Sequence, residues 1–203
     1  FVSIALIVMN IASKYQSIWQ CIRDVLFTVS SIITTTGYST ADFGKWPLFS
    51  QVILLLIMFF GACAGSTAGG LKISRVIMMV KMYVAEIRQM ISPNRVITVK
   101  YEDKPLSAKM QKNVAVYFVV YMILFITMLL IVSFSLGDFM TAFSAVAATF
   151  NNIGPGLGKV GPAYSFADLS NVSKVVLSFG MLAGRLEIFP MLILFAPATW
   201  KLK

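Results

Sequence analysis

The sequence predicts an all-α membrane protein made of two tandem copies of one unit: helix, short helix, turn and helix. Three observations favour this fold class. Hydrophobic residues make up 58% of the 203 residues and charged residues only 12%, whereas soluble domains average about 25% charged residues. Long apolar runs alternate with short apolar segments that end at glycine-containing turns. The two halves also align with each other at a nearly constant offset.

The first apolar segment, Phe1 to Ala12, is too short to cross a bilayer. As a helix it would extend about 18 Å, against a hydrocarbon core of about 30 Å. It has no initial Met and no basic region, so a signal peptide is not expected. We interpret it as the end of a truncated transmembrane helix, and the chain as a piece of a larger protein.

Three further apolar runs are candidates for crossing the membrane. Val114 to Phe134 is uncharged and long enough. Val172 to Trp200 is interrupted by a few charged residues, among them Arg185 and Glu187. Leu48 to Phe60 is too short alone, and apolar character resumes only at Leu71, after the segment "GACAGSTAGG". The sequence thus predicts one span broken by a glycine-rich loop.

Two shorter segments, Ser17 to Ile33 and Asp138 to Phe150, are predicted to be re-entrant helices that enter and leave on one side. They occupy equivalent places in an internal repeat. With an offset of 117 residues, "VSSIITTTGY" aligns with "VAATFNNIGP", which brings Gly37 onto Gly154. With an offset of 119 residues, "FFGACAGS" aligns with "SFGMLAGR".

The positive charge is concentrated between the two copies. Nine basic residues lie between positions 72 and 112, opposed only by Glu86, Glu102 and Asp103. Flanked by apolar spans, this cluster is typical of a cytoplasmic connection, with anionic lipid contact as a secondary use, and nucleic acid is not an expected partner. The basic residues are Lys72, Arg75, Lys81, Arg88, Arg95, Lys100, Lys104, Lys109 and Lys112.

The turn after each short helix has the composition of a cation site built from backbone. Carbonyl oxygens can replace the water around an ion, and glycine permits the backbone conformation that this requires. The C-terminal end of a short helix adds negative dipole character. The alternative is a polar turn at the membrane surface. The candidate residues are Thr35, Thr36, Gly37 and Tyr38 in the first turn, and Asn152, Ile153, Gly154 and Pro155 in the second.

Four motifs in order, "TTTGYSTADF", "GACAGSTAGGLK", "NNIGPGLG" and "GRLEI", resemble the Trk/Ktr/HKT superfamily of potassium transporters, and most closely the membrane subunit of bacterial Trk systems. The resemblance covers the whole chain. It implies four repeats of helix, pore helix, filter loop and helix around one potassium-channel-like pore. Residues 1–91 would be the third repeat, 92–112 the cytoplasmic connection and 113–203 the fourth.

The resemblance also implies roles for the site residues. Gly37 and Gly154 would be the central glycines of two filter strands, with potassium as the transported ion. The glycine-rich segment would be an intramembrane gate below the filter, and Arg185 would add a barrier to cations. The gate residues would be Gly61, Gly65, Ser66, Thr67, Gly69, Gly70 and Arg185.

Further implications concern location and partners. The family suggests the bacterial inner membrane, with residues 72–112 and the C-terminus in the cytoplasm. The partners would be the N-terminal half of the subunit, a second copy in a homodimer, and a cytosolic regulatory subunit that binds ATP, ADP or NAD. No organic cofactor is expected on this chain. The sequence leaves symport and channel mechanisms open.

Other interpretations of the same residues were weighed. The glycine-rich segment is a poor phosphate loop, because Leu71 separates Gly70 from Lys72 and no Ser or Thr follows the lysine. Gly61 and Gly65 could serve helix packing alone, as in a non-conducting membrane scaffold. Arg185 could form a structural ion pair, although Glu187 is two residues away and points elsewhere on a helix. An enzyme is not expected, since the sequence has no histidine.

Overall fold

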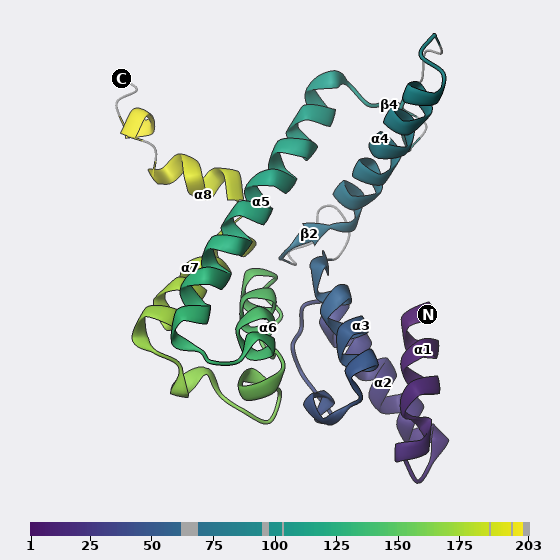
Figure 1. Cartoon of the computed structure of the whole chain (residues 1–203), viewed down its shortest axis with the longest axis vertical. Helices are drawn as coiled ribbons and strands as arrows, with labels where there is room; N and C mark the ends of the chain where they lie inside the picture. Colours follow the sequence, from purple (N-terminus) through teal and green to yellow (C-terminus); the bar gives the residue numbers. More distant parts are fainter. Residues whose placement is uncertain (62–68, 95–97, 103, 187, 196, 201–203) are drawn as a thin grey trace.

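The computed structural model describes residues 1–61, 69–94, 98–102, 104–186, 188–195 and 197–200. The described residues are mainly helical, and the order helix, short helix, turn and helix occurs twice along the chain (Figure 1). The elements are α1 (Val2–Ile11), η1 (Ala12–Lys14), α2 (Ile18–Ile33), η2 (Phe43–Lys45), α3 (Leu48–Phe59), β1 (Phe60–Gly61), β2 (Leu71–Lys72), α4 (Ile73–Ile91), β3 (Lys100–Tyr101), β4 (Lys104–Pro105), α5 (Ala108–Ser135), α6 (Phe139–Phe150), η3 (Gly158–Val160), η4 (Phe166–Asp168), α7 (Asn171–Arg185), α8 (Ile188–Phe195) and η5 (Pro197–Trp200).

The two short helices begin and end close to where the sequence predicts. Ser17 is the N-cap of α2, and Asp138 is the N-cap of α6. The Asp138 carboxylate accepts hydrogen bonds from the backbone N–H of Met140 at 3.3 Å and of Thr141 at 3.0 Å. An acidic N-cap satisfies N–H groups that have no partner within the helix and favours the positive end of its dipole. Both helices end directly before the glycine-containing turns.

Helix α5 is the one single helix among the described residues that is long and apolar enough to cross a membrane. It begins six residues before the predicted span. Apolar side chains are exposed along it, including Val119 at 54%, Ile123 at 57% and Leu130 at 68%. A helix that is apolar on its exposed faces needs apolar surroundings outside the chain.

The sequence suggested that the last apolar run is one continuous span. In the structure this run is bent. Helices α7 and α8 meet at a bend of 116°. Pro190 supplies a physical reason: it has no N–H to donate to the carbonyl of Leu186, and its ring would clash with that carbonyl in a continuous helix. In α8 it occupies the first turn, where a missing N–H costs little. Helix α8 consequently turns away from α7 (Figure 1).

The predicted break in the first copy is present between α3 and α4. Strands β1 and β2 pair in parallel, with Phe60 opposite Leu71 and Gly61 opposite Lys72. The chain therefore returns to the place where α3 ended before α4 starts.

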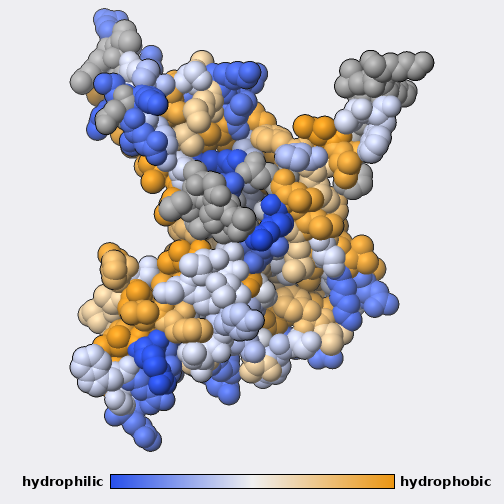
Figure 2. Space-filling model, turned by 180° about the vertical axis from the view of Figure 1, so that it is seen from behind, coloured by the Kyte–Doolittle hydropathy of each residue, from blue (hydrophilic) through white to orange (hydrophobic). Residues whose placement is uncertain are grey.

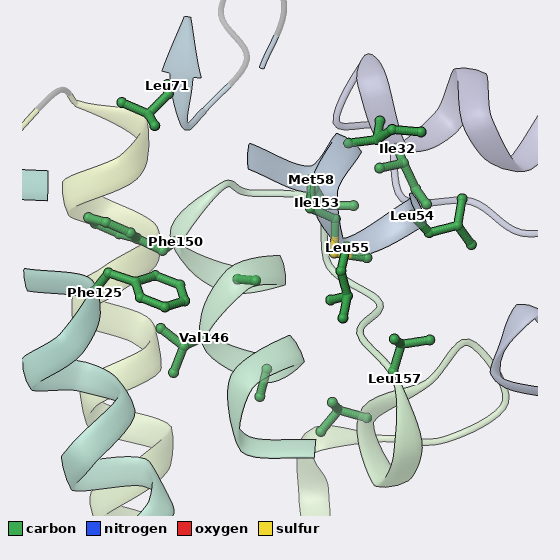
Figure 3. Packing of buried hydrophobic residues seen from close by; sticks show 14 of the residues in the cluster. Ile32, Leu54, Leu55, Met58, Leu71, Phe125, Val146, Phe150, Ile153 and Leu157 are labelled. Carbon is green, nitrogen blue, oxygen red and sulfur yellow. The ribbon is translucent and has the colours of Figure 1, made fainter. Parts of the chain in front are cut away.

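The core joins the two copies. The ring of Phe59 from α3 lies 5.3 Å from that of Phe125 in α5 and 6.0 Å from that of Phe143 in α6. Figure 3 shows aliphatic side chains of both copies gathered beside this region, with Met58 of α3 and Ile153 of the second turn in the same buried cluster. Because one core contains residues of both copies, the two turns are held at fixed places relative to each other.

A second, smaller buried cluster joins α4 to α5, around Met78, Met79, Leu106 and Val114. The hairpin of β3 and β4 connects these helices at the basic end of the molecule. Figure 2 shows hydrophilic surface at the far end of the α4 arm and extensive hydrophobic surface nearer the middle. This distribution fits the predicted connection outside an apolar layer.

The Asp138 cap leads to a stability prediction. Hydrogen bonding, chiefly from the Thr141 hydroxyl, lowers the pKa of Asp138 below its ordinary 3.8. Its stabilisation is therefore complete above the unfolded pKa and is lost as pH falls through the lower folded value. Asp138→Ala should destabilise the full-length subunit by about 1 kcal/mol, whereas Asp138→Asn should keep the cap. Thermal unfolding in detergent at neutral pH measures the difference, and equal stability of the two variants would contradict it.

Candidate cation site at the ends of the short helices

The turns after α2 and α6 have the same backbone conformation. Thr35 and Asn152, at equivalent positions of the repeat, have φ angles of 53° and 57°. Gly37 and Gly154 follow with φ angles of 78° and 107°. These values lie in a region that non-glycine residues rarely occupy. Two separate stretches of sequence therefore adopt one uncommon local structure.

Equivalent hydrogen bonds hold both turns. The N–H groups of Thr36 and Gly37 donate to the carbonyl of Ser31 at 2.9 and 3.5 Å. The N–H groups of Ile153 and Gly154 donate in the same way to Ala148, at 2.8 and 3.4 Å. Each helix end thus satisfies the N–H groups of the turn that follows it.

The carbonyl oxygens of the turns are left available. Among the described residues, no hydrogen bond reaches the carbonyl oxygens of 34–37 or 151–155. The negative ends of α2 and α6 lie at these turns. Carbonyl oxygens at the negative end of a helix dipole attract a dehydrated cation and disfavour an anion.

The two turns lie directly against each other. A Cβ atom placed on Gly37 would be 2.0 Å from the carbonyl oxygen of Ile153 and 3.2 Å from Cδ of Pro155. The structure therefore brings the two predicted groups of site residues together. The Tyr38 side chain is 74% exposed. Its carbonyl differs from those of 34–37 in that it accepts a hydrogen bond, from Ser31 Oγ at 2.6 Å.

The described flanks of the glycine-rich segment lie against the second turn. A Cβ atom on Gly69 would be 2.7 Å from the carbonyl oxygen of Asn151, and one on Gly61 would be 2.4 Å from the carbonyl oxygen of Gly69. Gly70, with a φ of 80°, is equally close to the Asn151 side chain. Only glycine fits such approaches. Of the predicted gate residues, Gly65, Ser66 and Thr67 lie outside the described residues.

Arg185 is the last residue of α7. This end of α7 lies against the end of α6 and the start of the second turn. A Cβ atom on the preceding Gly184 would be 2.0 Å from the carbonyl oxygen of Phe150 and 2.7 Å from Nδ2 of Asn152. Asn152 Nδ2 also donates to the carbonyl of Met181 at 3.0 Å. The same nitrogen would be 2.9 Å from a Cβ atom on Gly69, so Asn152 contacts both Gly69 and the end of α7. Glu187 lies outside the described residues.

One residue of this site was missed in the sequence analysis. Asn151 is fully buried, and its Oδ1 accepts a hydrogen bond from Tyr121 Oη at 2.8 Å. A polar residue at the last turn of an apolar helix is a signal that could have pointed to it, since buried amides need partners.

Comparison with known proteins is consistent with this geometry. The family model for TrkH, described as cation transport protein, matches residues 7–202. The chain belongs to the TrkH family. It is therefore a membrane protein, and the predicted superfamily resemblance is confirmed.

Individual relatives give the extent of the match. The Escherichia coli K12 protein "Trk system potassium uptake protein TrkH" is 39% identical over 201 residues, covering 98% of this chain and 41% of the relative. The Vibrio parahaemolyticus TrkH is 41% identical over 188 residues. Its crystal structure, titled as that of a potassium transporter, has a TM-score of 0.88 at 38% identity and covers 98% of this chain and 43% of that chain. The chain thus spans less than half the length of these relatives.

The close approach at Gly37 gives a testable consequence. Gly37→Ala should destabilise the full-length subunit by roughly 1–3 kcal/mol, because the new methyl group must displace the backbone of Ile153. Gly137→Ala is the matched control, since Gly137 has no atom within 4 Å of an added Cβ and no positive φ. Thermal unfolding with folded yield is the measurement. If the two variants behave alike, the packing of the two turns is wrong.

Proposed function

We propose that this chain forms two of the four filter segments of a potassium-uptake subunit in the bacterial inner membrane. The observation that carries the proposal is the repeated turn: two helix ends with equivalent φ angles and equivalent hydrogen bonds, lying against each other. The identity of the ion, potassium, is inferred from the relatives, whose names describe potassium uptake. Potassium is the substrate here, and no organic cofactor is assigned to this chain.

The two halves of the chain would act as the third and fourth pore repeats, residues 1–91 and 113–203, joined by a cytoplasmic connection at 92–112. In support, α2 and α6 precede the two turns, and the basic end of the molecule lies beyond α4 and the start of α5. Carbonyl oxygens near Thr36, Gly37, Ile153 and Gly154 would replace the water around the ion.

The glycine-rich segment would act as a gate below these carbonyls. In support, Gly69 and Gly70 touch Asn151, which directly precedes the second filter segment. Arg185 would contribute positive charge near Asn151, since the neighbouring Gly184 contacts Phe150 and Asn152 on either side of it. The loop and the arginine would together limit the passage of cations.

The partners would complete the pore and regulate it. A four-part filter needs the N-terminal half of the subunit, and a homodimer would be the assembled form. A cytosolic regulatory subunit that binds ATP, ADP or NAD would dock at the basic connection. Symport and channel mechanisms both fit this arrangement.

The filter assignment is tested at Gly154. Its φ of 107° costs a serine roughly 1–2 kcal/mol or more, so Gly154→Ser should reduce rubidium uptake about tenfold or make it sensitive to sodium. Uptake is measured in potassium-uptake-deficient bacteria that express the full-length subunit, with Gly137→Ser as control. Uptake unchanged in Gly154→Ser would remove the filter assignment. No uptake in any strain would favour a non-conducting scaffold.

The role of Arg185 has a separate test. Arg185→Gln should raise rubidium uptake about fivefold, because a positive charge at the proposed gate would oppose a passing cation by about 1 kcal/mol, the value for two unit charges about 4 Å apart in water. Lys14→Gln is the control, because Lys14 is an exposed lysine of η1, in the stretch before the first short helix. A decrease, or an equal effect of both substitutions, would contradict the barrier role.

A further inference from the structure

We propose that Tyr121 is a positioning residue for the second filter segment and that, through Asn151, it sets how well the filter discriminates between cations. The proposal rests on the proposed function, because it assumes that residues 152–155 line the ion path. It assigns a role to a tyrosine of α5 that does not itself touch the ion.

Tyr121 is held firmly at the helix end. Its side chain is 1% exposed, and its ring stacks on Phe150 with centroids 4.7 Å apart and an interplanar angle of 28°. Its hydroxyl donates to Oδ1 of Asn151 at 2.8 Å. The stacked ring orients the hydroxyl, so the donor reaches Asn151 without freedom to search for other acceptors.

The Asn151 side chain is hydrogen-bonded through both its nitrogen and its oxygen. Its Nδ2 donates to the carbonyl of Ala147 at 2.8 Å, and its backbone N–H donates to the same carbonyl at 3.1 Å. The side chain thus folds back over the end of α6, and the Tyr121 hydroxyl fixes its remaining oxygen. The next residue, Asn152, has the positive φ that begins the filter segment. Movement of Asn151 would therefore move the carbonyls that follow.

The Asn151 side chain also contacts the flank of the glycine-rich segment. A Cβ atom on Gly70 would be 2.4 Å from Oδ1 of Asn151. Oδ1 thus lies close to both the Tyr121 hydroxyl and Gly70. Removing the hydroxyl leaves a buried carbonyl oxygen without this donor, and such a group rearranges to find another partner.

The first filter segment is held in a different way. Thr34 occupies the position equivalent to Asn151; its Oγ1 donates to the carbonyl of Ser30 at 2.7 Å and lies 2.8 Å from Oγ1 of Thr36. Ile4, the residue 117 positions before Tyr121, has no hydroxyl. The first segment is therefore fixed by hydroxyls of its own turn, and the second by a tyrosine from another helix. Loss of the Tyr121 hydroxyl should therefore act directly on the second segment and not on the hydroxyl bonds of the first.

Tyr121→Phe in the full-length subunit tests this role, because it removes the hydroxyl and keeps the stacked ring. Tyr117→Phe is the matched control: the same substitution one turn earlier on α5, at a buried ring that lies against Arg75 and Phe189. Rubidium uptake is measured in potassium-uptake-deficient bacteria over a range of sodium concentrations. Folded subunit in the membrane is quantified in parallel, so that a loss of protein is separated from a change in the filter.

We expect the ratio of the sodium inhibition constant to the rubidium KM to fall about threefold to tenfold in Tyr121→Phe, the range for one lost hydrogen bond. Tyr117→Phe should keep the wild-type ratio. A purely structural tyrosine would lower the amount of subunit and leave the ratio unchanged, and that result overturns the proposal. If the wild-type subunit takes up no rubidium, the proposed function itself fails, and the inference fails with it.

Discussion

The structure depends on one constraint: a helix that ends inside an apolar layer must supply hydrogen-bond acceptors for the backbone beyond its end. An N–H group left without any partner in such a layer costs several kcal/mol. At Ser31 and at Ala148, one helix carbonyl accepts two N–H groups of the following turn. This arrangement needs a positive φ at two positions of each turn, which explains the glycines at 37 and 154. Among the described residues, no backbone N–H donates to the carbonyl oxygens of 34–37 or 151–155.

Packing converts these local turns into one site. Phe59, Phe125 and Phe143 bring α3, α5 and α6 together, and Ile153 belongs to the same core as Met58. The turn backbones then approach so closely that Gly37 has no room for a side chain. The distance between the carbonyls of the two turns is therefore set by a close-packed, aromatic-rich core.

Local signals explain why much of this fold could be predicted from the sequence. Ser17 and Asp138 stand where N-caps are expected, so the starts of α2 and α6 were predictable. The break after α3 followed from the length of the apolar run. The bend between α7 and α8 also has a local cause in Pro190, but composition alone made the run look continuous. The β1–β2 pair could not be predicted, because two-residue strands have no pattern of their own.

The contacts around Asn151 show where prediction from sequence ends. Tyr121 lies 30 residues before Asn151, and whether they meet depends on how α5 is rotated against α6, which no local pattern records. The same holds for Gly70, whose approach to Asn151 depends on the path of the chain after α3. The internal sequence repeat correctly placed the two turns at equivalent positions. It did not predict that different side chains would support them. Equivalent backbone therefore need not mean equivalent support. The first turn is bonded through hydroxyls of its own segment, whereas the second is bonded through Asn151 to α5 and also lies against Gly70.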